Sequence, residues 1–185
     1  MINDSMIIIG LGGNLSYEGA RPEITLNRSI EWLSLQDIKV LEWSPFYISR
    51  PVPPSGQPDF VNAALQIVTD MSAAELLEVL HQCETKFGRK RSDRWEARSL
   101  DLDLLVFKGQ ILPSLDAWNS IVENPDPSAF TNDVMVPHPR LHKRSFALTP
   151  LLDLWPDFHH PILGVSGRDL LNEIKDQPIE LLDQK

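Results

Sequence analysis

The sequence of 185 residues has a single cysteine, no long apolar run and fewer basic than acidic residues. Cys83 alone cannot form an intramolecular disulfide or a multi-cysteine metal site, and its helical spacing with apolar neighbours predicts a core position. The N-terminus lacks a basic segment followed by a long apolar one, and no stretch approaches the length of a membrane span. We therefore expect a cytoplasmic protein that folds as one domain over residues 1–185.

Positive charge is scarce overall but concentrated in one segment. The formal net charge of -9 argues against non-specific binding to nucleic acid or to acidic membranes. Between positions 86 and 98, however, only Asp93 and Glu96 oppose six basic residues: Lys86, Arg89, Lys90, Arg91, Arg94 and Arg98. This segment predicts a small anionic ligand, and a solvated loop that happens to be basic is the alternative.

The common nucleotide-binding motifs are also missing. Gly10, Gly12 and Gly13 follow a short apolar stretch, but Leu15 stands where the dinucleotide pattern G-x-G-x-x-G needs its last glycine. The P-loop pattern G-x-x-x-x-G-K-[ST] does not occur anywhere in the sequence. If this protein binds ATP, it therefore does so without a P-loop.

Periodicity and capping signals predict an alternation of strands and helices. Strands are expected at 6–15, 38–49 (bent, because of Pro45), 60–69 and 100–107, and helices at 22–33, 72–87, 144–154 and near 166–176. Residues 113–135 show little periodicity and predict a long loop insertion. The order β-α-β-β-α-β predicts an α+β, ferredoxin-like antiparallel sheet with helices on one face, followed by C-terminal helices.

Two of the predicted strands place polar side chains on the same sheet face. Alternation puts Phe60 and Asn62 opposite the apolar face of strand 60–69. In strand 100–107, Asp101 and Asp103 lie opposite a core face made by Leu100, Leu102, Leu104 and Val106. Both polar sets should therefore point away from the helices, onto an open surface.

The aspartate pair needs positive charge nearby. Residues two apart on a strand lie about 6.6 Å apart on one face, and two carboxylates at that distance repel by about 2–3 kcal/mol at an effective dielectric near 20. Arg94 or Arg98 could supply the charge in a purely structural ion-pair network. A divalent cation is the functional alternative, because carboxylate oxygens suit Mg²⁺ with a shell completed by water and phosphate.

The surroundings favour the metal. Arg89, Arg91, Arg94 and Arg98 come just before the aspartates, and His138 with Arg144 forms a second cationic group. Guanidinium groups bind phosphates in a bidentate manner. Carboxylates, arginines and a polyphosphate together are typical of a phosphoryl-transfer site. No side chain stands out as a general base.

Five segments together resemble the 6-hydroxymethyl-7,8-dihydropterin pyrophosphokinase family of the folate pathway. They are GLGGNL at 10–15, SPFYISRPV at 44–52, QPDFVNAAL at 57–65, GRKRSDRWEARSLDLDLLVF at 88–107 and VPHPRLHKRSFALTPL at 136–151. They keep the order of the family and spread over most of the chain. Gly13 departs from it, because the family usually has serine there, and the segment before Trp95 is about one residue shorter than in some relatives.

The resemblance implies a reaction, cofactors and site residues. The family transfers pyrophosphate from ATP to the hydroxymethyl group of the pterin, releases AMP and uses two Mg²⁺, here bound by Asp101 and Asp103. The implied pterin-binding residues are Ser49, Val52, Phe60, Asn62, Trp95 and Phe146. The implied ATP-binding residues are Glu84, Arg89, Trp95, Arg98, His138 and Arg144. The arginines assigned to catalysis are Arg89, Arg91 and Arg98.

Two other classes of function compete with this prediction. A different Mg²⁺-dependent phosphotransferase or a nuclease could use the same aspartate pair. A non-catalytic ferredoxin-like binding module could use the same sheet face. Under the family interpretation the partners are ATP and the pterin, with no nucleic acid and no membrane, and we expect a monomer.

Overall fold

The structure is a computed structural model that describes residues 5–89, 97–124 and 134–183. Its centre is a six-stranded sheet in which β5, β1, β4, β3 and β6 are neighbours in that order, and β2 also pairs with β4. All the pairings are antiparallel. The strands are β1 (Ile7–Gly13), β2 (Lys39–Trp43), β3 (Tyr47–Ser49), β4 (Phe60–Val68), β5 (Asp101–Phe107) and β6 (Ile179–Leu181).

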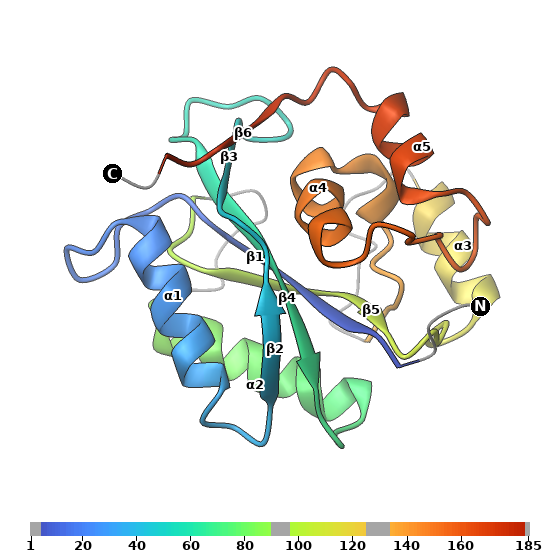
Figure 1. The fold of residues 1–185 in the computed structure, drawn as a ribbon, viewed down its shortest axis with the longest axis horizontal. Coiled ribbons are helices and arrows are strands. Elements are labelled where there is room, and N and C mark those ends of the chain that lie inside the picture. Colours follow the sequence, from blue (N-terminus) through green and yellow to red (C-terminus); the bar gives the residue numbers. More distant parts are fainter. Residues whose placement is uncertain (1–4, 90–96, 125–133, 184–185) are drawn as a thin grey trace.

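Two amphipathic helices, α1 (Pro22–Leu33) and α2 (Ala73–Lys86), cover one face of this sheet (Figure 1). A capping box formed by Ser72 and Glu75 begins α2, as the sequence predicts. Apolar side chains of both helices pack on the inward face of β1, β4 and β5 and form the larger hydrophobic core. The main strands and these two helices thus lie close to their predicted positions.

The other face of the sheet is covered in part. Helices α4 (Ser145–Leu154) and α5 (Gly167–Glu173) lie on this side, together with the 3₁₀ turn η2 (Leu141–Lys143) (Figure 1). A second, smaller core joins them to the sheet through Ile8, Ala64 and Leu105. The expectation of an open second face is therefore wrong for the half that lies beneath α4.

The predicted strand 38–49 is divided into β2 and β3 around Pro45. Proline has no backbone N–H for the ladder, and Ser44 bridges the interruption. Its backbone N–H donates to the carbonyl oxygen of Ala64 at 2.9 Å, and its hydroxyl accepts from the N–H of Ala64 at 2.9 Å. The bend predicted from Pro45 is confirmed.

Two further expectations are wrong. A register shift between Ile8 and Ile9, opposite Leu105, turns Val106 onto the second face, away from the predicted core face. An inserted residue on one strand reverses the alternation beyond it.

The second concerns the predicted loop 113–135, in which residues Leu115–Glu123 form helix α3. The helix is short, and only Trp118 among its side chains is buried, so its period is hard to detect. The hydroxyl of Ser114 caps it by accepting from the N–H of Ala117. Residues 125–133 of the same segment lie outside the described residues.

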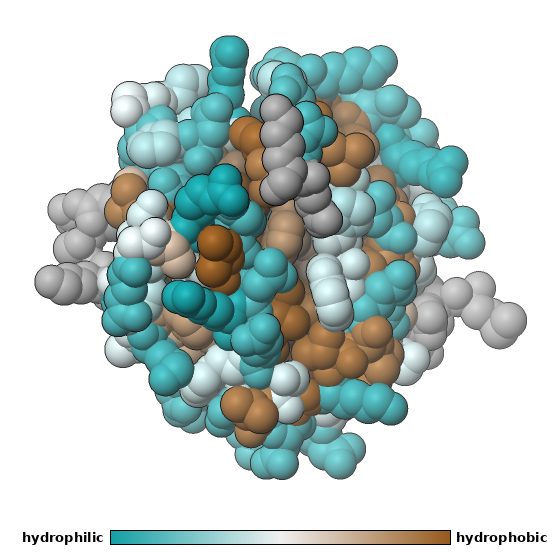
Figure 2. Space-filling model, turned by 60° about the vertical axis from the view of Figure 1, so that its left-hand side comes forward, coloured by the Kyte–Doolittle hydropathy of each residue, from teal (hydrophilic) through white to brown (hydrophobic). Residues whose placement is uncertain are grey.

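The described residues form five α-helices around an antiparallel sheet, a mixed α and β architecture. In these residues, no helix combines the length and apolar character needed to cross a membrane. Figure 2 shows a face on which hydrophilic side chains predominate and hydrophobic ones gather in smaller areas.

Candidate functional site

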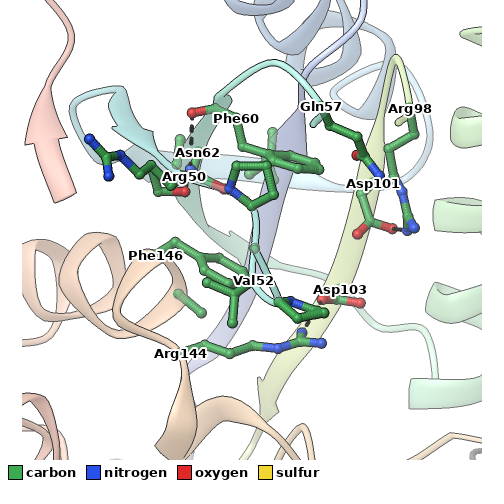
Figure 3. A pocket seen from close by; sticks show the side chains of 18 of the residues that line it. Arg50, Val52, Gln57, Phe60, Asn62, Arg98, Asp101, Asp103, Arg144 and Phe146 are labelled. Carbon is green, nitrogen blue, oxygen red and sulfur yellow. Dashed lines mark hydrogen bonds and ion pairs between the residues drawn. The ribbon is translucent and has the colours of Figure 1, made fainter. Parts of the chain in front are cut away.

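A cavity of about 150 Å³ opens on the uncovered half of the second sheet face. Its wall combines β1, β4 and β5 with the loop after β3 and the start of α4. Figure 3 shows Phe60 and Phe146 on different sides of the space, and Asp101 and Asp103 along one edge. The predicted site residues that line it are Ser49, Val52, Phe60, Asn62, Arg98, Asp101, Asp103, Arg144 and Phe146.

The floor of the cavity is made by glycines that the sequence motifs did not assign to a site. Gly10 pairs with Asp103, and Gly12 pairs with both Asn62 and Asp101. A Cβ atom at Gly10 would lie 3.3 Å from the side chain of Leu105, and one at Gly12 would lie 3.4 Å from Oδ1 of Asn62. Because Gly10 and Gly12 have no side chains, they leave open space between the polar side chains of the neighbouring strands. The alternation of glycine in β1 is the feature of the sequence that could have indicated this cavity.

Two aromatic rings and one buried amide line the cavity. Asn62 is 3% exposed and its Nδ2 donates to Oγ of Ser49 at 2.9 Å. Phe60 comes from β4 and Phe146 from α4, and both are partly exposed. A flat heterocycle with hydrogen-bonding edges suits such a wall, because rings bind its faces and an amide binds its edge.

Arginines hold the first aspartate. Oδ1 of Asp101 accepts from Nη1 of Arg89 at 2.6 Å and lies 3.0 Å from Nη1 of Arg98. The structural ion-pair network considered from the sequence is therefore present, with Arg89 as its additional member. Arg98 lines the cavity, whereas Arg89 reaches Asp101 from the end of α2.

The second aspartate lies beside a different arginine and a histidine. Oδ2 of Asp103 accepts from Nη1 of Arg144 at 3.2 Å and lies 3.8 Å from Nε2 of His138. Burial acts to raise the pKa of Asp103, but the neighbouring His138 and Arg144 lower it below its usual value. Burial lowers the pKa of His138 to about 4 despite the nearby Asp103. Asp103 is thus ionised and His138 neutral near pH 7.

Glu84 lies behind this constellation and does not line the cavity. It is 1% exposed, and its Oε1 accepts from the backbone N–H of Leu102 at 2.8 Å and from Arg89. Burial, followed by the charge of Asp101, raises the pKa of Glu84 to about 7. Its predicted contact with ATP remains a prediction.

Asn14 is a structural residue of the site that the sequence analysis missed. Its side chain is buried, donates to Oε1 of Gln57 and to the carbonyl oxygen of Pro58, and accepts from the N–H of Arg98 at 2.8 Å. A Cβ atom at the preceding Gly13 would lie 2.5 Å from the carbonyl oxygen of Ser99. Glycine at 13 thus allows the chain before β5 to approach closely, and Asn14 holds Arg98 beside the cavity.

The two aspartates fit a divalent cation only under one condition. No group of three or more histidine, cysteine or carboxylate side chains suited to a metal occurs among the described residues. Two carboxylates on one face provide hard oxygen ligands, but water and a phosphate-bearing substrate must complete the shell. Arg91 and Trp95, which the sequence also assigns to the site, lie outside the described residues.

Comparison with known proteins agrees with this chemistry. The model of the 7,8-dihydro-6-hydroxymethylpterin-pyrophosphokinase (HPPK) family matches residues 8–156. A 2-amino-4-hydroxy-6-hydroxymethyldihydropteridine pyrophosphokinase from Pseudomonas aeruginosa is 32% identical over 181 residues, which cover 96% of this chain and 95% of that protein. One from Haemophilus influenzae is 33% identical over 154 residues, 83% of each chain.

Longer proteins contain a similar region. The folic acid synthesis protein fol1 of Pneumocystis carinii is 32% identical over 179 residues, so this chain matches only 21% of its length. A crystal structure of an HPPK-DHPS in complex with substrates has a TM-score of 0.60 at 14% identity, covering 92% of this chain and 43% of that one. Wild-type HPPK-DHPS from Plasmodium falciparum gives a TM-score of 0.59, with 40% of its chain covered. These structures show the similarity of fold.

Proposed function

Because the chain belongs to the 7,8-dihydro-6-hydroxymethylpterin-pyrophosphokinase family, we propose that it transfers pyrophosphate from ATP to 6-hydroxymethyl-7,8-dihydropterin in folate synthesis. The products are AMP and the pterin diphosphate. The observation that carries the proposal is the cavity itself, in which the pair Asp101 and Asp103 borders a pocket walled by Phe60, Asn62 and Phe146.

The pterin binds in the apolar part of the cavity. Phe60 and Phe146 contact its ring faces, and the amide of Asn62 binds its polar edge. Val52 and the backbone of Ser49 complete this wall. The buried position of Asn62 supports the assignment, because an amide held by Ser49 presents a fixed edge to the ligand.

Asp101 and Asp103 would hold Mg²⁺, two ions in the family pattern. When bound, Mg²⁺ neutralises charge on the polyphosphate and orients it. Both carboxylates face the cavity and are surrounded by cations, which keeps Asp103 ionised and able to act as a ligand. The aspartates are also two residues apart on β5 and point to the same face of the sheet, so that a single polyphosphate can reach both.

The arginines and His138 bind the ATP side of the site. Arg89, Arg98 and Arg144 already converge on the two aspartates, where the charge of a polyphosphate bound beside them would concentrate. Their guanidinium groups donate to phosphate oxygens and stabilise charge that develops during transfer. Arg91 and Trp95 remain predicted contacts.

Catalysis rests on positioning and electrostatics. The hydroxymethyl oxygen of the pterin attacks the β-phosphorus of ATP, the bond to the α-phosphate oxygen breaks, and AMP leaves. The phenylalanine rings and Asn62 hold the nucleophile, and the arginines hold the phosphates. No protein side chain at the cavity is assigned as the general base.

The fold assignment also belongs to this proposal. The central order β5-β1-β4, with β2 and β3 both beside β4, and the two helices on one face support the ferredoxin-like topology. A single domain over residues 1–185, a monomeric state and a cytoplasmic location stay predictions.

The test is product analysis with ATP, Mg²⁺ and the pterin, using wild type beside Asp101→Ala. We expect AMP and pterin diphosphate from wild type and a loss of at least about 10²-fold in the variant. Formation of ADP would replace the proposal with an ordinary kinase, and cleavage of nucleic acid would replace it with a nuclease. Unchanged binding of ATP·Mg²⁺ by the variant would favour a binding module without metal.

A further inference from the structure

Glu84 is a buried carboxylate next to the site, and the reaction proposed above gives it no chemical task. It lies near the end of α2, on the helical side of the sheet, and is 1% exposed. Its Oε1 accepts from the N–H of Leu102, the residue between the two aspartates. Its Oε2 has no hydrogen-bond partner among the residues that the structure describes. Glu84 is not among the residues that line the cavity.

The guanidinium group of Arg89 connects Glu84 to the cavity. Nη1 of Arg89 donates both to Oε1 of Glu84 and to Oδ1 of Asp101, the latter at 2.6 Å. Gly88, with a φ of +85°, ends the helix, and the N–H of Arg89 donates to the carbonyl oxygen of Glu84 at 3.0 Å. The backbone thus returns Arg89 to the carboxylate five residues before it.

Asp101 therefore has competing cationic partners. A metal ion that binds Oδ1 of Asp101 competes for this oxygen with the guanidinium groups of Arg89 and Arg98. Arg89 is also held by a second carboxylate, that of Glu84, which is buried and hydrogen-bonded in place. The charge of Glu84 continues to attract the guanidinium group of Arg89 after a metal ion has taken Oδ1 of Asp101.

We propose that Glu84 is a positioning residue that acts through Arg89, retaining its guanidinium group when the metal takes Asp101. The inference rests on the proposed function for the identity of the metal and of the polyphosphate. Glu84 thereby lowers the metal concentration needed to fill the site, and it keeps Arg89 close enough to donate to the phosphates. Its influence should vanish when Arg89 is absent.

A double-mutant cycle tests this dependence. The four proteins are wild type, Glu84→Gln, Arg89→Gln and the double variant, in which two neutral amides replace the charged pair and can still hydrogen-bond. Mn²⁺ binding is measured by electron paramagnetic resonance with α,β-methylene-ATP, whose bond to be broken is replaced by a stable one. Glu78→Gln, on the exposed side of α2, is the matched control and should bind Mn²⁺ as wild type does.

We expect Glu84→Gln to weaken Mn²⁺ binding by about tenfold in the presence of Arg89, within the range for contacting charged pairs. In the Arg89→Gln background the same change should have no further effect. An equal weakening in both backgrounds would overturn the proposal, because it would mean that Glu84 acts on the metal or the nucleotide directly. No weakening by Glu84→Gln in either background would overturn it as well.

Two further measurements separate this inference from the proposed reaction. Urea unfolding of the four ligand-free proteins reports the coupling between Glu84 and Arg89 without any metal, and we expect the double variant to be more stable than Arg89→Gln alone. AMP formation by wild type is measured in parallel. Intact coupling without AMP would overturn the reaction and leave the Glu84 role supported, whereas AMP without coupling would overturn only the role of Glu84.

Discussion

Strands β1, β4 and β5 run through both halves of the sheet face that carries the cavity, and their side chains change character on the way. In the half beneath α4, Ile8, Ala64 and Leu105 pack into the second core. Farther along the same strands, glycines, Asn62 and the two aspartates line the cavity. Alternation along a strand therefore tells which face a residue occupies, whereas the change of residue type along that face tells what lies above it.

The two halves also differ in what they contribute. The covered half buries apolar area and adds to the free energy of unfolding. The open half holds ionised groups whose mutual attraction offsets their partial desolvation, with little net gain in stability. Substitutions in the open half should thus alter activity more than stability, and substitutions in the covered half should do the reverse.

The largest expected effect concerns Asp103. Asp103→Asn keeps the shape of the side chain but removes its charge, and we expect AMP formation to fall by about 10²–10³-fold. The free energy of unfolding should change by no more than about 1 kcal/mol, because the side chain is 34% exposed. Steady-state kinetics and urea unfolding measure the two quantities, and a near-wild-type rate would remove Asp103 from the proposed metal site.

The opposite behaviour is expected at Leu148, a fully buried residue of α4. Leu148→Ala removes apolar contacts and leaves space, and should lower the free energy of unfolding by about 2–5 kcal/mol. AMP formation per folded molecule should remain within a few-fold of wild type. Leu163→Ala is the control, since Leu163 is 40% exposed. A severe loss of activity in a well-folded Leu148→Ala protein would contradict the separation of the two halves.

A smaller, pH-dependent effect should arise at the edge of the covered half. His160 is buried against Trp118, Phe158 and His142. Burial, with the added charge of His142, lowers its pKa from 6.5 to about 4. As the pH falls below 6.5, this histidine takes up a proton in the unfolded chain before it does so in the folded protein. The free energy of unfolding should therefore decrease between pH 6.5 and pH 4, by up to about 1.4 kcal/mol per pH unit.

Urea unfolding at several pH values checks this expectation. The pKa of His142 is also lowered, by burial and by Lys143, and that of His138 is lowered to about 4, so both add to the loss in the same direction. His160→Gln should make the pH dependence shallower. An equal slope in wild type and His160→Gln would show that the histidine is not protonated preferentially in the unfolded chain.

The smallest expected effect concerns Ser49, which orients Asn62. Ser49→Ala removes one hydrogen bond, and we expect the KM for the pterin to rise by about threefold to tenfold with an unchanged KM for ATP. Ser49→Thr keeps the hydroxyl group and should behave closer to wild type. Equal changes in both KM values would indicate a general disturbance of the cavity.

The sequence predicted which residues meet at the cavity better than it predicted the cavity's surroundings. Phe60, Asn62, Asp101 and Asp103 line one cavity, as alternation on two strands indicated. Their roles as ligands stay predictions. The sequence did not predict which arginine contacts which aspartate. Arg89 and Arg98 contact Asp101, whereas Arg144, which is distant from them in the chain, contacts Asp103.

What could not be predicted depended on non-local geometry. The register shift in β1 and β5 turns Val106 to the second face, and no single-strand pattern reveals it. The link made by Asn14 joins three segments whose closeness follows only from the complete fold. The indole N–H of Trp118 donates to the carbonyl oxygen of Pro137, and Trp118 lies on a helix too short to show a period.

The segment after residue 156 lies beyond the part of the chain that matches the family model. It nevertheless supplies Phe158 and Leu170 to the second core, and β6 to the edge of β3, while none of its described residues lines the cavity. It supports α4, the helix that carries Phe146, from the side away from the cavity. Exposed positions of this segment can therefore be changed, for heat resistance or for attachment to a surface, without replacing a group that lines the cavity.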